Sequence, residues 1–201
     1  MRKLMFGLFS VAAMLPATAF AASPFGDQTG SMTFAVDAGR GECKFISDMT
    51  AEKITGTAKG LGGSFTVDPA NPAGTSGKLT IPVARLESGN AMRDSHMRGP
   101  DWLNAPKQPE LFFDISGVAG LAGEGNRAKG KASGKFGMAG QTKAIDVPVE
   151  LAFAAEQKVL KVTTKFTLLL SDFGIKGKAG TVGKTVSDKI AVECTVYAKA
   201  K

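Results

Sequence analysis

The chain has 201 residues, of which 43% are hydrophobic and 21% are charged, and its formal net charge is +7 at pH 7. This composition is typical of one globular domain and is too apolar for a disordered chain. With two cysteines and one histidine, the chain cannot supply a four-cysteine zinc site, and a histidine-rich metal centre is implausible. We therefore expect no metal.

The first segment has the features of a secretory signal peptide. Arg2 and Lys3 precede an apolar stretch over residues 4–15, which is too short to span a bilayer comfortably. Residues 19–21, Ala-Phe-Ala, then match a cleavage site, and cutting after residue 21 leaves a mature domain over residues 22–201. An uncleaved membrane anchor is the alternative. Export would remove two positive charges and place the domain in an oxidising compartment.

Alternating apolar and polar residues predict strands along most of the mature chain. Weaker patterns come first, over residues 31–36, 61–67, 78–83, 111–115 and 131–138. The strongest patterns follow over residues 144–153, 160–170 and 189–196. Pro148 interrupts one of them and predicts an edge or a bulge, because proline cannot donate a hydrogen bond to a ladder.

Residues 87–107 break the alternation and predict a short helix and loop that cross one end of the sheet. At least eight strands with little helix predict an all-β domain, either a sandwich or a barrel. A barrel of about eight strands can be packed solid or can hold one small ligand. Small residues on the apolar side of several strands, beside large phenylalanines, would leave room for a cavity.

The two cysteines favour the barrel. In an oxidising compartment Cys43 and Cys194 are expected to form a disulfide, although two buried thiols are the alternative. The bridge would close a loop of 151 residues, worth about 5 kcal/mol in the chain-entropy model. Because Cys43 lies near the first strands and Cys194 lies on the last, the bridge would join the two ends of the domain, as closure of a barrel does.

Five motifs, in this order and spacing, resemble those of the YceI-like family of exported lipid-binding barrels. They are GSFTVD at residues 63–68, RDSHM at 93–97, PDWLN at 100–104, QPELFF at 108–113 and SDFGI at 171–175. The resemblance implies a lipocalin-like antiparallel β-barrel in the periplasm that holds a long apolar guest, such as a polyisoprenoid or quinone tail. The paired cysteines are not a general feature of that family.

The resemblance also suggests which residues meet the guest. The residues expected to line an apolar tunnel are Phe65, Ile81, Phe113, Phe136, Phe166 and Leu168. Arg93, Asp94 and His96 are expected near its mouth, where they would contact a headgroup. The alternatives are a structural ion pair between Arg93 and Asp94 and an exposed or capping role for His96.

Other function classes fit the sequence less well. There is no Gly-x-Ser-x-Gly elbow, phosphate loop or dinucleotide fingerprint, so neither catalysis nor a cofactor is expected. The lysines are spread along strand faces, which argues against nucleic-acid binding but would favour transient contact with an anionic membrane surface. We expect a periplasmic carrier or store of a long-chain isoprenoid or other lipid. The alternative is a non-catalytic stress-response or partner-binding barrel with a packed interior. The sequence leaves the oligomeric state open, with a homodimer as one option.

Overall fold

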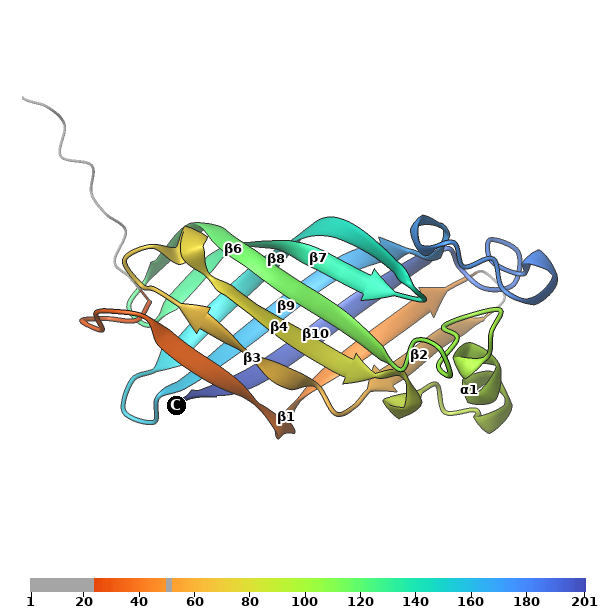
Figure 1. Ribbon diagram of the computed structural model, residues 1–201, viewed down its shortest axis with the longest axis horizontal. Coiled ribbons are helices and arrows are strands. Elements are labelled where there is room, and N and C mark those ends of the chain that lie inside the picture. Colours follow the sequence, from red (N-terminus) through yellow and green to blue (C-terminus); the bar gives the residue numbers. More distant parts are fainter. Residues whose placement is uncertain (1–23, 50–51) are drawn as a thin grey trace, which may run out of the picture.

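The computed structural model describes residues 24–49 and 52–201. These residues form one closed antiparallel β-barrel with a short α-helix at one end (Figure 1). The expected fold class is therefore confirmed. The expected signal peptide lies outside the described residues. Within the described ranges, no helix is both long and apolar enough to cross a bilayer.

Ten strand segments build the eight positions of the barrel wall. The segments are β1 (Met32–Asp48), β2 (Lys53–Ala58), β3 (Gly62–Val67), β4 (Ser76–Pro82), β5 (Leu86–Glu87), β6 (Glu110–Glu124), β7 (Arg127–Met138), β8 (Gln141–Ala154), β9 (Val159–Leu169) and β10 (Lys189–Ala200). The long β1 pairs with β3 along its first half and with β2 along its second half. In the next position, β4 pairs with β3 and β5 pairs with β2. Pairing of β1 with β10 closes the barrel.

A β-bulge in β1 lets the strand pair with β3 before the bend and with β2 after it. Its register with β10 shifts between Val36 and Gly41, which bends the strand. Gly41 has a φ of 100°, and a Cβ atom there would collide with the backbone carbonyl of Thr195. Glycine is therefore the residue that this bend accommodates.

The ladder between β8 and β9 is interrupted part-way along the two strands. Their ladder runs from the pair Ala154–Val159 to the pair Val149–Thr164 and ends beside Pro148. Residues 141–148 of β8 keep their pairing with β7, and residues 165–169 of β9 keep theirs with β10. The Thr164 hydroxyl donates to the Pro148 carbonyl over 2.6 Å, at the point where the two strands part. The edge expected at Pro148 is present.

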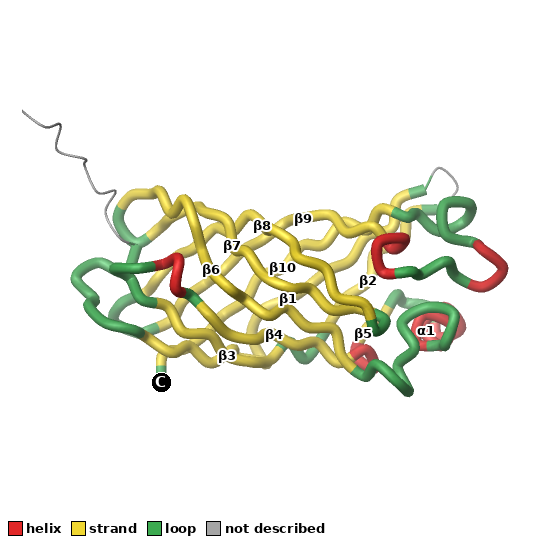
Figure 2. Tube along the Cα trace, turned by 45° about the horizontal axis from the view of Figure 1, so that its top comes forward, coloured by secondary structure: helices red, strands yellow, loops and turns green. Residues whose placement is uncertain are grey.

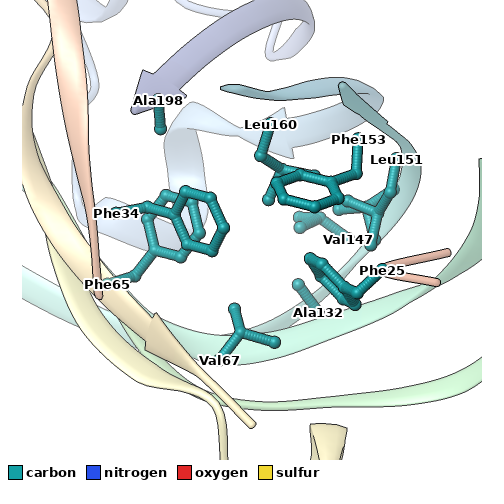
Figure 3. Close-up of a cluster of buried hydrophobic side chains, with 11 residues drawn as sticks. Phe25, Phe34, Phe65, Val67, Ala132, Val147, Leu151, Phe153, Leu160 and Ala198 are labelled. Carbon is teal, nitrogen blue, oxygen red and sulfur yellow. The ribbon is translucent and has the colours of Figure 1, made fainter. Parts of the chain in front are cut away.

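One end of the barrel is packed by aromatic side chains, and we call it the closed end. Phe25 precedes β1 and meets Phe34, Phe65 and Phe153 inside the wall (Figure 3). Ring centroids are 5.3 Å apart for Phe25 and Phe153 and 5.6 Å apart for Phe34 and Phe65. Phe25, Phe34 and Phe153 are each at most 2% exposed. Close contacts of this kind exclude water and fix the side chains in one arrangement.

The opposite end carries α1 (Ala91–Arg98) and the connection between β9 and β10, and we call it the mouth end. That connection contains the 3₁₀ helices η3 (Leu170–Phe173) and η4 (Lys178–Gly180); two more, η1 (Pro72–Gly74) and η2 (Val83–Arg85), lie on either side of β4. Figure 2 shows α1, η3 and η4 together at the end away from the C-terminus. Asn90 begins α1, because its side-chain oxygen accepts hydrogen bonds from the backbone N–H groups of Met92 and Arg93. The helix and loop expected within residues 87–107 are thus confirmed.

Candidate functional site

The barrel encloses a cavity of about 920 Å³. Ligand pockets usually measure about 300–1,000 Å³, so this one is large enough for a sizeable ligand. Apolar side chains from strands all around the wall line it. The described interior is therefore hollow between its two ends, and it is not the solid core that was the alternative.

The residues expected to line a tunnel do face this cavity. Phe65 comes from β3, Ile81 from β4, Phe113 from β6 and Phe136 from β7, while Phe166 and Leu168 come from β9. They share the inward side of their strands, as the alternation predicts. Their contact with a ligand remains a prediction.

Glycines on the inner wall help to keep the cavity open. A Cβ atom at Gly56 would collide with the ring of Phe45, and one at Gly134 would lie 2.7 Å from the ring of Phe113. Both rings therefore lie directly over a glycine of the neighbouring strand. A side chain at either position would push its ring toward the centre of the barrel. Small residues beside large ones thus leave space, as expected.

Two of the three polar residues expected at the mouth line the cavity. Arg93 and His96 project from α1, together with Met92, which is 71% exposed. The Arg93 guanidinium donates to Glu52 over 2.8 Å and to the Ser88 hydroxyl over 3.1 Å. Arg93 thereby ties the helix to the residue that precedes β2.

Asp94 faces away from the cavity and anchors α1. It is 9% exposed, and its carboxylate accepts hydrogen bonds from the hydroxyl and the backbone N–H of Ser88, over 2.6 and 2.7 Å. The Ser88 hydroxyl bond is the main cause that holds the pKa of Asp94 below its ordinary value. The Ser88 backbone bond and the positive charges of Arg98 and Arg93 act in the same direction, against the opposing effect of burial. Asp94 therefore fixes the position of α1 through Ser88.

The second wall of the mouth is the segment from residue 174 to residue 188, which we call the mouth loop. Its base is fixed by Asp188, whose carboxylate accepts from the backbone N–H and the hydroxyl of Ser171. Phe173 is buried against Phe136, with ring centroids 5.8 Å apart. Gly174 then reverses the chain with a φ of 70°. The SDFGI motif therefore builds the hinge between β9 and the mouth loop.

Besides Ile175 of the SDFGI motif, the mouth loop contributes Lys178, Thr181, Thr185 and Val186 to the cavity, and sequence reasoning missed these four. No hydrophobic periodicity marks this glycine-rich segment. Tertiary contacts position it, because a Cβ atom at Gly177 would lie 2.8 Å from the Trp102 ring. Trp102 also lines the cavity, so the loop that follows α1 and the mouth loop meet at the entrance.

The expected disulfide between Cys43 and Cys194 is confirmed. The two cysteines lie directly opposite each other on β1 and β10, and both line the cavity. The bridge belongs to the apolar cluster of the mouth half, together with Leu168, Leu170 and Phe173. It therefore fastens the first strand to the last on the side of the entrance.

The described ranges contain no group of three or more histidine, cysteine, aspartate or glutamate residues able to hold a metal ion. The charged residues that line the cavity are Lys44, Glu52, Arg93 and Lys178. Glu52, Arg93 and Lys178 lie at the mouth end, Lys44 lies on β1 with its side chain on the outer face, and the apolar cluster around Phe65 lines the closed end. The cavity is thus amphiphilic along its length.

A match to the YceI-like domain covers residues 34–198, which is most of the chain. The chain belongs to the YceI-like family. Among curated relatives of this YceI-like protein, a UPF0312 protein of Pseudomonas putida is 32% identical over 154 residues, covering 74% of this chain and 77% of the relative. The expected family is confirmed, including over the residues that carry the motifs.

Solved structures share the YceI-like barrel. BcnA of Burkholderia cenocepacia matches with a TM-score of 0.72 at 23% identity, over 81% of this chain and 98% of its own. A polyisoprenoid binding domain from Saccharophagus degradans matches with a TM-score of 0.67 at 16% identity, over 84% and 98%. A YceI protein of Campylobacter jejuni matches with a TM-score of 0.60 at 25% identity, over 77% and 88%.

Proposed function

We propose that this YceI-like protein binds one long amphiphilic ligand of polyisoprenoid, quinone or fatty-acid type inside its barrel, for transport or storage. The observation that carries the proposal is the cavity of about 920 Å³, apolar along the wall and polar at the mouth. Burial of each methylene group contributes about 0.8 kcal/mol, so a long tail can bind tightly without specific polar contacts. The polyisoprenoid binding domain of Saccharophagus degradans, which shares the fold, supports this ligand class.

The polar groups of the mouth have distinct parts in the proposal. Arg93 and His96 contact the headgroup from α1, and Asp94 holds that helix in place through Ser88. Binding of this kind needs no reacting group, and we expect neither catalysis nor a cofactor.

The proposed site of action is the periplasm. The Cys43–Cys194 disulfide supports export to an oxidising compartment, as does the expected signal peptide. A ligand of this kind is drawn from a lipid surface or delivered to one. Transient contact between the mouth end and an anionic membrane is therefore part of the proposal.

The first test is native mass spectrometry of protein purified from the periplasm in detergent-free buffer, with organic extraction of anything bound. The expected result is a discrete added mass that extracts as a lipid and identifies the guest. An unliganded mass that persists after incubation with isoprenoids and fatty acids would overturn the proposal.

A matched pair of variants locates the guest. Phe166→Asp places a charge on the inner wall, whereas Thr167→Asp places the same charge on the exposed outer side of the same strand. The inner variant should lose the bound lipid and the outer variant should keep it, with both still showing the circular dichroism of the folded barrel. Lipid retained by a folded Phe166→Asp variant would contradict the assignment.

A further inference from the structure

The charges that line the mouth are unevenly compensated. Arg93 is paired with Glu52, with 2.8 Å between the guanidinium and the carboxylate. Lys178 has no carboxylate within ion-pair distance among the described residues, and it lines the same cavity. The uncompensated charge at the mouth is therefore positive and lies on the mouth loop.

A second observation points to the same place. The Thr181 hydroxyl is buried and has no hydrogen-bond partner among the described residues, although Thr181 lines the cavity. A buried hydroxyl without a partner is costly, and rotation of the Thr181 side chain away from Gly177 would let the hydroxyl donate to a ligand that brings an acceptor. Lys178 and Thr181 lie three residues apart on the mouth loop, which is at the same end of the barrel as α1 (Figure 1).

The mouth loop is arranged before any ligand arrives. The Thr181 carbonyl accepts hydrogen bonds from the backbone N–H groups of Lys184, Thr185 and Val186, over 3.0, 3.0 and 3.3 Å. Gly177 packs against Trp102, and Asp188 fixes the base of the loop. Because the backbone that carries Lys178 and Thr181 is held in this way, binding of a headgroup costs less conformational entropy.

We propose that Lys178 and Thr181 form an anion subsite at the mouth that selects amphiphiles with a phosphate or carboxylate headgroup over neutral ones. An ammonium and a hydroxyl both donate hydrogen bonds, and bonds to a charged acceptor are about twice as strong as those to a neutral one. Arg93 and His96 border the headgroup from the opposite wall. The inference rests on the proposed function, because the tail must occupy the barrel for the headgroup to reach this point.

The test compares two ligands with one tail, geranylgeranyl phosphate and geranylgeraniol. Trp102 is the single tryptophan of the chain and lines the cavity, so its fluorescence reports binding. The wild type should bind the phosphate about tenfold more tightly than the alcohol. Lys178→Met and Thr181→Val should each lower that preference by about threefold or more, because affinity for the phosphate falls further than affinity for the alcohol.

Lys184→Met is the matched control, because Lys184 lies on the same loop but does not line the cavity. It should keep the full preference. Equal losses in Lys178→Met and Lys184→Met would reveal only a diffuse charge effect and would overturn the subsite. No preference in the wild type would overturn it as well, while tight binding of the alcohol would leave the proposed function standing.

Inorganic phosphate separates the two sources of the anion. Millimolar phosphate that displaces geranylgeranyl phosphate but not the alcohol would show that the subsite takes a free anion. No displacement, with the Lys178 dependence intact, would show that the tail must deliver the headgroup. Failure of both geranylgeranyl ligands to bind any variant would overturn this inference together with the proposed function.

Discussion

The closed end of the barrel is filled by phenylalanine rings, whereas the mouth end is covered by α1 and the mouth loop. Phe25, Phe34 and Phe153 are nearly inaccessible to solvent and touch one another. At the mouth, polar contacts such as Asp94–Ser88 and Asp188–Ser171 hold the segments, and the disulfide fastens the wall beneath them. The closed end thus relies on packed aromatic rings, whereas the mouth end combines an apolar cluster that includes Phe173 and Ile175 with polar contacts and a covalent bond.

This difference between the two ends fits the proposed binding of a ligand that enters the barrel at the mouth. Apolar packing is cooperative, because removing one ring leaves a cavity that its neighbours cannot fill. At the mouth end, exposed polar contacts such as Asp188–Ser171 can be exchanged for water at lower cost, whereas the buried Asp94–Ser88 bond holds α1 in place. The disulfide keeps β1 and β10 together at the mouth end of the barrel.

The largest expected effect comes from removing the covalent bond. Cys43→Ser with Cys194→Ser should lower the free energy of unfolding by about 5 kcal/mol, because the bridge closes a loop of 151 residues in the unfolded chain. Urea denaturation measures the loss. Amide hydrogen exchange should rise more in the mouth half of β1 and β10 than at the closed end. A uniform rise along the barrel would remove the distinction between the two ends.

Loss of packing at the closed end should have the next largest effect. Phe153→Ala should lower the free energy of unfolding by about 4 kcal/mol, since Phe153 is 2% exposed and contacts two other rings. Phe166→Ala is the control, because this ring faces the cavity, and its loss should cost about 2 kcal/mol. Equal losses in the two variants, measured by urea denaturation, would mean that the cavity wall is packed as tightly as the closed end.

Asp94 tests how much a buried polar contact at the mouth end contributes to the stability of the fold. Asp94→Asn should lower the free energy of unfolding by about 1–2 kcal/mol at neutral pH, because Ser88 then donates to a neutral acceptor. The folded state holds the pKa of Asp94 below its ordinary value, so the carboxylate stabilises the protein above about pH 4. That contribution is lost as the pH falls through the lower folded pKa.

The advantage of the wild type over Asp94→Asn should therefore shrink in acid, as measured by thermal unfolding between neutral pH and about pH 3. Asp101→Asn changes an exposed carboxylate of the same segment and should leave stability nearly unchanged. An advantage that stays constant throughout this acid range would contradict the assigned role of Asp94.

The smallest expected effect is a gain in the free energy of unfolding. Thr75 is 2% exposed, and its hydroxyl has no hydrogen-bond partner among the described residues. Thr75→Val keeps the shape and removes the unpaired group, which should raise the free energy of unfolding by about 1 kcal/mol. Thr33→Val is the control, since the Thr33 hydroxyl bonds to that of Thr66 over 2.9 Å, and it should bring no gain. A loss in Thr75→Val would show that the hydroxyl is satisfied.

The sequence predicted the parts of the fold whose inward residues are large. Strands β8, β9 and β10 alternate clearly because their inward side chains are mostly valine, leucine and phenylalanine. Strand β2 was missed, because its inward residues include Gly56, which must be small to accommodate the Phe45 ring. The extensions of β6 and β7 beyond the predicted ranges are rich in glycine and alanine, which carry no hydrophobic pattern.

The residues of the candidate site also divide into those that strand alternation predicts and those that only tertiary contacts place. Inward positions such as Phe113 and Phe166 follow from strand alternation. The bonding of Asp94 on α1 to Ser88, away from the cavity, does not. Lys178 and Thr181 could not be found in this way, because contacts with Trp102 and Ser171 position their loop. Local periodicity carries no information about such contacts.

The seam beside Pro148 determines how the barrel responds to guests of different thickness. In a fully laddered barrel, strand number and register fix the circumference. Here the ring of backbone hydrogen bonds is incomplete along the mouth half of β8 and β9, and the phenylalanine rings at positions 136, 166 and 173 pack in that region. Side-chain packing, in place of a backbone ladder, therefore holds the mouth half of the seam between β8 and β9. If the proposed guest is bulky, these rings can turn to make room without breaking a ladder hydrogen bond.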